Sequence, residues 1–220
     1  MISDLYMDKI RNKDKIKASE ITILGGSFNP VHNGHIKMAQ TAHEQFGLDN
    51  IVFMPNKSTY YKDNEQFVSD AARLEMLRLA TEDYDYMTLS DMEIKRGGTT
   101  HTIDTVRELL YENEDRTIYF IIGGDSLEWI DKWVEGDKIL EFVVLLTAVR
   151  GETDIKKSNE IINKLYELYP NADILLLDMD DTPISSSDIR RRVESENAIT
   201  GLVPQKVEQY ILDNKLYWRA

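Results

Sequence analysis

The chain has 220 residues, which is enough for one domain with a sizeable apolar core. Its 42% hydrophobic and 30% charged residues are typical of a globular protein and exclude a disordered chain. A net charge of −13 repels phosphate backbones, so we expect no nucleic-acid partner. The absence of cysteine excludes disulfides, thiolate metal ligands and a cysteine nucleophile.

The first residues are polar and rich in lysine. We expect an N-terminal arm at residues 1–18, helical or frayed, in front of one domain at residues 19–220. The longest nearly unbroken apolar run, residues 142–149, is too short to cross a bilayer, and the charged start carries no hydrophobic signal region. These features predict a cytoplasmic protein without a membrane partner.

The apolar pattern alternates between continuous runs and runs at helical spacing. The continuous runs predict strands at residues 21–26, 50–55, about 86–92, 117–124, 142–149 and 172–178. The helically spaced runs predict helices at residues 35–46 with Gly47 as the C-cap, from 69 or 70 to 80, at about 102–112, one or two up to 140, and at about 154–168, 185–195 and 204–214. Loops are predicted at residues 56–68 and 94–100, and the length of the first is typical of a functional loop.

Continuous apolar strands that alternate with amphipathic helices indicate parallel strands covered on both faces and joined by right-handed crossovers. The predicted fold class is therefore α/β, with a single doubly wound parallel sheet that is Rossmann-like. Ligands of such sheets bind at the carboxyl ends of the strands, where the strand order reverses. The glycine pairs at residues 25–26 and 123–124 both stand at predicted strand ends.

The stretch GGSFNPVHNGH, residues 25–35, follows the first strand. Its glycines let the backbone approach a ligand, and Pro30 and Asn33 help to turn the chain into a helix whose first amides can bind phosphate. His32 and His35 lie three residues apart at this helix start, so both can face one point and donate to phosphate oxygens. A metal pair or two solvated cap histidines are the alternatives. Neither a GxGxxG after a strand nor a GxxxxGK[ST] motif occurs.

A second stretch, PISSSDIR at residues 183–190, opens a later helix. Serines there can cap the free amides of the helix, and those amides attract phosphate together with the helix dipole. Arg190 in the first turn can pair with phosphoryl oxygens. An ordinary serine cap with a solvated basic run at residues 190–192 is the alternative, but the pairing with the first stretch favours phosphate binding.

These two stretches resemble the signatures of the HxGH nucleotidyltransferase superfamily. Three others resemble the bacterial nicotinate mononucleotide adenylyltransferases within it: Gly123-Gly124-Asp125 as a nucleotide contact, Lys132-Trp133 as a pair whose indole stacks on the pyridine ring, and residues 102–105 as the helix start that cradles the nicotinate carboxylate. The resemblance covers nearly all of the chain from Ser19 to Tyr217.

The resemblance implies an enzyme that transfers the adenylyl group of ATP to nicotinate mononucleotide and releases pyrophosphate, a step towards NAD. It implies ATP and nicotinate mononucleotide as partners, Mg²⁺ accompanying ATP, and no metal site in the protein itself; a homodimer stays open. The alternatives are a sister transferase with another acceptor such as nicotinamide mononucleotide, a non-catalytic nucleotide-binding paralogue, and a metal-dependent hydrolase. The last would need more ligands than the spacing of His43 and His101 supplies.

The resemblance and the residue chemistry together give three sets of site residues. The predicted catalytic residues are His32, His35 and Arg190. The predicted ATP-binding residues are Gly25, Gly26, Ser27, Phe28, His32, His35, Gly123, Asp125, Ile184, Ser185, Ser186 and Arg190. The predicted mononucleotide-binding residues are Asn29, Lys57, Tyr61, His101, Thr102, Asp104, Lys132, Trp133 and Arg150.

The chain departs from the family pattern at two places. Residues 59–62 read Thr-Tyr-Tyr-Lys where the family has Pro-Pro-His-Lys, and His101 stands where the family usually has tyrosine. The two rings stand as though they had traded positions, and we hypothesise that Tyr61 and His101 lie near each other at the mononucleotide pocket. These changes leave the choice between nicotinate and nicotinamide open, and Lys57 and Lys62 are further candidate phosphate contacts.

Overall fold

The computed structural model describes residues 20–57, 67–179 and 183–218, with the backbone alone at 150–153. A single six-stranded sheet has the order β3-β2-β1-β4-β5-β6, and all its pairings are parallel. The strands are β1 (Glu20–Gly26), β2 (Ile51–Pro55), β3 (Met87–Leu89), β4 (Thr117–Gly123), β5 (Val143–Arg150) and β6 (Asp173–Met179). The predicted doubly wound fold is confirmed.

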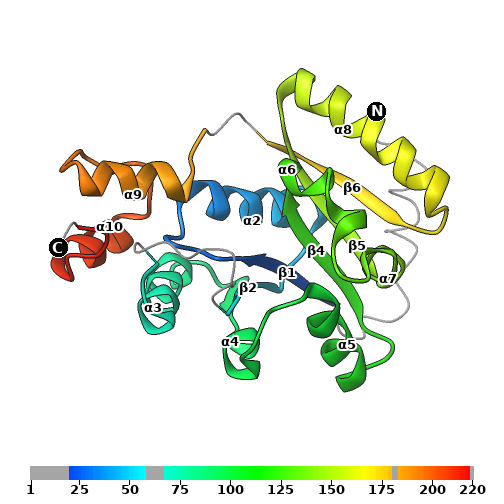
Figure 1. Cartoon of the computed structure of the whole chain (residues 1–220), viewed down its shortest axis with the longest axis horizontal. Helices are drawn as coiled ribbons and strands as arrows, with labels where there is room; N and C mark the ends of the chain where they lie inside the picture. Colours follow the sequence, from blue (N-terminus) through cyan, green and yellow to red (C-terminus); the bar gives the residue numbers. More distant parts are fainter. Residues whose placement is uncertain (1–19, 58–66, 180–182, 219–220) are drawn as a thin grey trace.

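Helices cover both faces of this sheet (Figure 1). They are α2 (Asn33–Phe46), α3 (Asp70–Thr81), α4 (Met92–Arg96), α5 (Thr102–Glu112), α6 (Gly124–Leu127), the 3₁₀ turn η1 (Ile130–Lys132), α7 (Gly136–Phe142), α8 (Gly151–Leu168), α9 (Ser186–Glu194) and α10 (Gln205–Asp213). Gly47 ends α2 in the left-handed conformation, with φ 68°, as its role of C-cap requires. No helix in the described ranges is long and apolar enough to cross a membrane.

Two apolar cores lie on the two faces of the sheet. Leu24 packs into the core formed with α2, α3, α9 and α10, whereas its neighbour Ile23 packs into the core formed with α5, α7 and α8. The same alternation separates Ile121 from Phe120 on β4. Successive side chains of a strand point to opposite faces, so a continuous apolar run is the pattern that a sheet buried on both faces requires.

The segment after α3, which contains β3 and α4, differs from the prediction. The strand expected at residues 86–92 is only Met87–Leu89, and α4 begins at Met92, in place of the strand end and part of the predicted loop. Ser90 Oγ accepts the Met92 amide at 3.3 Å, and the buried Glu93 carboxylate accepts the Thr105 hydroxyl at 2.6 Å. The Ser90 contact is a local side-chain to backbone bond that competes with a strand, and the Glu93 contact fixes this turn against α5. In addition, α8 begins at Gly151, three residues before the predicted start.

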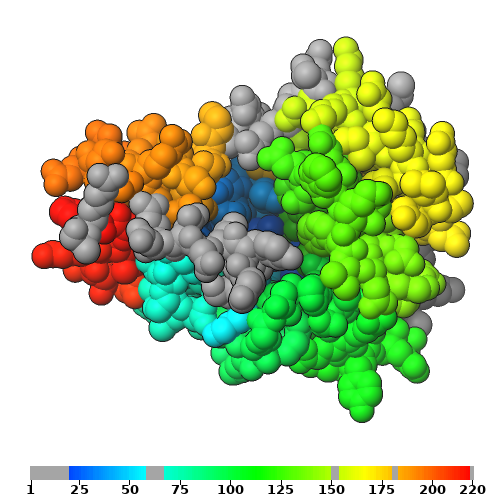
Figure 2. All heavy atoms as spheres, viewed as in Figure 1, coloured from blue at the N-terminus to red at the C-terminus, as the bar shows by residue number. Residues whose placement is uncertain are grey.

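The strand order reverses between β1 and β4, which are neighbours in the sheet. From β1 the chain crosses to β2 and β3, and from β4 it crosses the other way to β5 and β6, so the loops after β1 and β4 diverge. In the space-filling view, the β1–α2 region in blue is recessed between α9 in orange and the green segment that follows β4 (Figure 2). The carboxyl ends of β1 and β4 therefore lie at the place where a doubly wound sheet binds its ligand.

Candidate active site

The turn that connects β1 to α2, residues 25–35, is called the phosphate turn below. Within it Phe28 adopts a left-handed backbone with φ 45°, and its ring is buried edge-on against His35 with 4.9 Å between ring centroids. A left-handed non-glycine residue is strained, and such strain is typical of functional turns. Since the Phe28 ring lies in the core, only its backbone can meet a nucleotide.

Arg73 of α3 holds the phosphate turn by hydrogen bonds to its backbone. Its side chain is fully buried, and its guanidinium donates to the carbonyls of Ser27 and Asn56 at 2.8 Å each. It also donates to Asp70 at 2.6 Å, so the buried charge is paired. Arg73 thereby ties the loop after β1 to the loop after β2. Sequence reasoning missed this residue, although an arginine between the apolar residues of an amphipathic helix was a signal.

His32 and His35 stack on each other, with 3.7 Å between ring centroids and 25° between planes. The His32 amide donates to Nδ1 of His35 at 3.2 Å, which assigns the His35 proton to Nε2, the nitrogen that can donate to a phosphoryl oxygen. His32, only 7% exposed, forms the N-cap of α2. The structure thus brings both predicted histidines together at the start of α2. The amides of Asn33 and His35 there already donate to the carbonyls of Leu202 and His32, each at 2.9 Å, so the imidazole N–H groups are the main donors that this helix start can offer to an anion.

The glycines of the phosphate turn make room for aromatic rings. A Cβ atom on Gly34 would lie 3.0 Å from Nδ1 of His32, one on Gly26 would lie 3.3 Å from the Phe28 ring, and one on Gly25 would lie 3.3 Å from the Phe120 ring. A side chain at any of these positions would therefore crowd a ring of the site. That the glycines also give a ligand clearance stays a prediction.

The stretch at residues 183–190, called the α9 motif below, docks directly on the phosphate turn. Ser186 Oγ donates to the carbonyl of Pro30 at 2.8 Å, and Arg190 Nη1 donates to the carbonyl of Asn29 at 2.7 Å. Ser185 caps α9 by accepting the amide of Asp188 at 3.1 Å. Two motifs more than 150 residues apart therefore form one wall, with α2 and α9 both beginning there.

The end of β4 carries the other predicted nucleotide contacts. Gly123 precedes α6, and Asp125 lies exposed in its first turn. A Cβ atom on Gly124 would lie 3.0 Å from the carbonyl of Ala148 on β5, so this glycine permits close approach of the two strand ends. Ile184 is half-buried against the core beneath α9. Whether these residues contact ATP stays a prediction.

Trp133 is connected to the phosphate turn through the ring of Phe120. It is half-buried and meets Phe120 edge-on, with 6.4 Å between ring centroids, and Phe120 is the ring beneath Gly25. Lys132 is exposed and forms an ion pair with Asp131 at 2.8 Å. The two residues of the predicted pair therefore differ: Trp133 packs against the sheet through Phe120 of β4, whereas the side chain of Lys132 extends into solvent.

The start of α5 is held near the end of β2. The Lys57 amide donates to Thr100 Oγ1 at 3.1 Å, which fixes the residues just before the α5 start beside the strand end. His101 is the N-cap residue of α5, and Thr102 and Asp104 lie in its first turn. The ammonium group of Lys57 pairs with Asp70 at 2.5 Å. Binding of the mononucleotide by these residues stays a prediction.

Three predicted contacts lie outside the described residues or side chains: Tyr61, Lys62 and the side chain of Arg150. The hypothesis that Tyr61 and His101 lie near each other is therefore untested. Asn29, by contrast, is placed clearly: it is 2% exposed, and its Oδ1 accepts the Val68 amide at 3.3 Å and the Tyr217 hydroxyl at 2.8 Å. This geometry gives Asn29 a supporting place behind the site, and its predicted contact with the mononucleotide stays a prediction.

Known proteins resemble this chain in both sequence and fold. Residues 23–192 match the cytidylyltransferase-like family model, a range that includes both the phosphate turn and the α9 motif. The chain belongs to this family. A curated protein of Lachnoclostridium phytofermentans, named as a probable nicotinate-nucleotide adenylyltransferase, is 36% identical over 198 residues, which are 90% of this chain and 98% of that protein. A Dehalococcoides mccartyi protein of the same name is also 36% identical, over 90% of this chain and 96% of its own length.

A solved structure shares the fold of this chain. The Plasmodium falciparum nicotinic acid mononucleotide adenylyltransferase complexed with NaAD superimposes with a TM-score of 0.73 at 22% identity, over 90% of this chain and 97% of that one. The family resemblance that the sequence predicted is confirmed, as is the prediction of a nucleotidyltransferase enzyme.

The charges of the site follow from burial and pairing. Burial alone would raise the pKa of Asp70, but hydrogen bonds from Lys57 and Arg73 outweigh it and hold that pKa below its usual value. Burial lowers the pKa of the Arg190 guanidinium, while the nearby Tyr217 hydroxyl acts in the opposite direction.

In the described ranges, no three His, Asp or Glu side chains lie close enough together to hold a metal ion. The wall formed by the phosphate turn and the α9 motif instead presents N–H donors and a guanidinium, which suits an anion.

Proposed function

We propose that this protein transfers the adenylyl group of ATP to nicotinate mononucleotide, giving nicotinate adenine dinucleotide and pyrophosphate. The observation that carries this proposal is the docking of Ser186 and Arg190 on the carbonyls of Pro30 and Asn29. That docking brings the two motifs into one site at the switch point of the sheet, where their helix dipoles and donor side chains favour an anion. The names of the curated relatives support nicotinate mononucleotide as the acceptor.

The reaction needs no protein nucleophile. A phosphate oxygen of nicotinate mononucleotide attacks the α-phosphorus of ATP in line; a new O–P bond forms while the bond to the α–β bridging oxygen breaks, and pyrophosphate leaves with that electron pair. Catalysis consists of positioning and charge stabilisation. The structure supplies donors for both, because the starts of α2 and α9 meet at the same wall.

His35 and His32 are the proposed donors to the reacting phosphates. The His35 tautomer places a proton on Nε2, and the stacked His32 ring restrains its orientation. Arg190 Nη1 is held by the Asn29 carbonyl and Nη2 by Ser187 Oγ at 3.3 Å, so the guanidinium is fixed before substrate arrives. Together with the first amides of α9 it would bind the β- and γ-phosphates.

Mg²⁺ enters this proposal with ATP. The described residues offer the ion no acidic cluster and offer phosphates many N–H donors, so the oxygen ligands of Mg²⁺ would come from the triphosphate and water. When bound, Mg²⁺ offsets the charge that develops on the leaving pyrophosphate.

A cytoplasmic location and a homodimer stay predictions of the sequence.

The proposed acceptor pocket lies between Trp133 and the start of α5. The Trp133 indole would stack on the pyridine ring, and the first amides of α5, at Thr102 and Ile103, would receive the nicotinate carboxylate. His101 at the N-cap stands beside those amides. A helix start favours a carboxylate over a neutral amide, which gives a physical reason for nicotinate as the acceptor.

The test is product formation by the purified full-length protein. We expect incubation with ATP, Mg²⁺ and nicotinate mononucleotide to yield pyrophosphate and a dinucleotide of the mass of nicotinate adenine dinucleotide. Parallel reactions contain nicotinamide mononucleotide or no acceptor. Pyrophosphate only with another acceptor would reassign the protein to a sister transferase, and ATP binding without any product would make it a nucleotide-binding paralogue.

A further inference from the structure

Tyr217, close to the C-terminal end, reaches back to the phosphate turn. It is 6% exposed, and its hydroxyl donates to Oδ1 of Asn29 at 2.8 Å, across 188 residues of sequence. The backbone of Tyr217 is left-handed with φ 67°, a strained conformation for a residue with a side chain. Surrounding structure must maintain such strain, and strained residues are concentrated at functional sites.

Asn29 is the junction through which this contact acts. Its main-chain carbonyl accepts Arg190 Nη1 at 2.7 Å, while its side-chain oxygen accepts both the Tyr217 hydroxyl and the Val68 amide. The side chain and the carbonyl belong to one buried residue, so fixing one restrains the other. The position of the Arg190 guanidinium therefore depends on the contact between Tyr217 and Asn29.

The environment of the Tyr217 hydroxyl makes it a fixed donor. Burial raises its pKa well above the usual value, although the nearby guanidinium groups of Arg190 and Arg73 act to lower it. The neutral hydroxyl keeps its proton and, being buried, requires an acceptor, which Asn29 provides. These two guanidinium groups are the ones that hold the phosphate turn, so the hydroxyl lies at the centre of its support.

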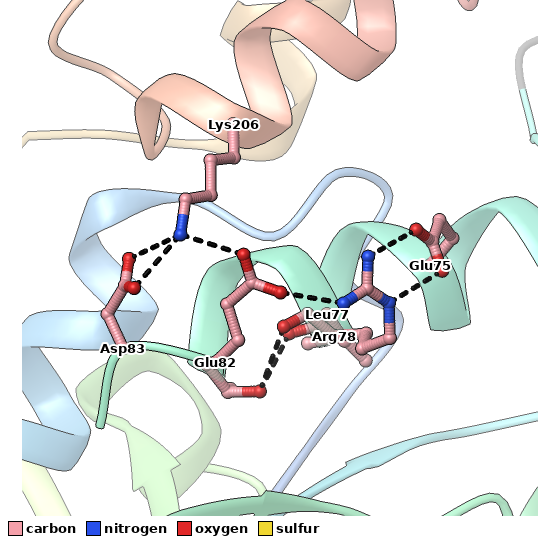
Figure 3. A network of polar contacts seen from close by, with 7 residues as sticks. Glu75, Leu77, Arg78, Glu82, Asp83 and Lys206 are labelled. Carbon is pink, nitrogen blue, oxygen red and sulfur yellow. Dashed lines mark hydrogen bonds and ion pairs between the residues drawn. The ribbon is translucent and has the colours of Figure 1, made fainter. Parts of the chain in front are cut away.

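The segment that carries Tyr217 is attached to the protein by other contacts as well. Figure 3 shows Lys206 at the start of α10 bridging Glu82, at 2.7 Å, and Asp83, at 2.9 Å, beside α3. Arg78 extends this network by pairing with Glu82 and Glu75. Val207 and Ile211 of α10 are fully buried in the core. Removing only the Tyr217 hydroxyl should leave the ring, α10 and the network in place.

We propose that Tyr217 is a positioning residue for adenylyl transfer: its hydroxyl holds Asn29, and Asn29 holds Arg190 in the geometry that the transition state requires. Tyr217 touches neither substrate nor reacting atoms in this role. The inference rests on the proposed function for its catalytic readout, and on the hydrogen bonds alone for its structural readout.

Tyr217→Phe is the test, with Tyr210→Phe on α10 as the matched control, because Tyr210 packs on the same core and no hydrogen bond from its hydroxyl exists within the described residues. We expect kcat of Tyr217→Phe to fall about 10-fold while both KM values change less than about 2-fold, since a small misplacement of a phosphate contact acts on the transition state. In an Arg190→Ala background the same substitution should change kcat by less than about 2-fold, because its route of action is gone.

A second measurement separates this inference from the proposed function. Amide hydrogen exchange in residues 26–35 should become faster in Tyr217→Phe than in the wild type and Tyr210→Phe, while the Tm of Tyr217→Phe falls by no more than about 4 °C, the cost of one buried hydrogen bond. If the wild-type protein shows no turnover, the proposed function is contradicted. The amide hydrogen exchange rates of residues 26–35 then still test whether Tyr217 positions the phosphate turn. Wild-type kcat in Tyr217→Phe, a full 10-fold loss that persists without Arg190, or unchanged exchange would each overturn the role of Tyr217.

Discussion

The two sides of the candidate site are built differently. The phosphate side is made of the phosphate turn, whose centre at residues 28–32 is buried, and the more exposed α9 motif, and short hydrogen bonds join these segments although they are far apart in sequence. The acceptor side, made of Trp133, Lys132 and the start of α5, is half-buried or exposed, and its ring contact is a single edge-on pair. The departures from the family pattern, at residues 59–62 and at His101, also fall on the acceptor side.

This difference indicates a division of labour. A triphosphate is the same in every reaction of this kind, so a rigid, pre-organised wall suits the phosphate side. An acceptor pocket built from exposed helix starts and loops can change its residues without disturbing the core. We therefore expect substitutions on the phosphate side to change kcat or stability, and substitutions on the acceptor side to change the KM of the mononucleotide.

The largest effect is expected for His35→Ala. Removal of one donor to charge that develops in the transition state lowers kcat about 10²- to 10³-fold in comparable sites. Steady-state pyrophosphate release measures this, with His43→Ala near the other end of α2 as the control that should retain activity. An unchanged kcat in His35→Ala would remove this histidine from the mechanism.

Arg73→Met is expected to act on stability. It removes a fully buried guanidinium, leaves the carbonyls of Ser27 and Asn56 without this donor, and leaves Asp70 paired with Lys57 alone. Breaking such a buried pair costs about 3 kcal/mol or more of unfolding free energy. Urea denaturation followed by circular dichroism gives the value. A loss below about 1 kcal/mol would show that the two loops do not depend on this tie.

On the acceptor side, Trp133→Ala should raise the KM of nicotinate mononucleotide about 10-fold and leave the KM of ATP unchanged, because loss of one stacked ring costs about 1–3 kcal/mol. The matched control is Trp129→Ala, whose side chain is 62% exposed. If the KM values of both substrates rose together, the division between the two sides would be wrong at this residue.

The smallest effect is expected from the ion pairs of Asp70. Its pKa is lower in the folded protein than in the unfolded chain, so its contribution to stability is present above the usual pKa of aspartate and is lost as pH falls through the lowered value. Unfolding measured from pH 6 down to pH 3 should show a stability loss that is smaller in Asp70→Asn. Equal slopes for the two proteins would mean that this pairing is absent in solution.

Sequence reasoning captured the fold and the two phosphate motifs because both follow from local patterns. Continuous apolar runs predicted the strands, and serine or histidine before a helix predicted its start. It missed Arg73 and Tyr217, whose partners lie far away in sequence. It also misplaced α4, because the buried Glu93 of this helix is held by a tertiary contact with the Thr105 hydroxyl.

The most direct measurement of the central claim is the ratio of kcat/KM for nicotinate mononucleotide to kcat/KM for nicotinamide mononucleotide in the wild-type protein. A helix start that binds a carboxylate, with phosphate contacts common to both acceptors, predicts a preference for nicotinate of about 10-fold or more. A ratio near one, a preference for nicotinamide, or no pyrophosphate with either acceptor would contradict the account.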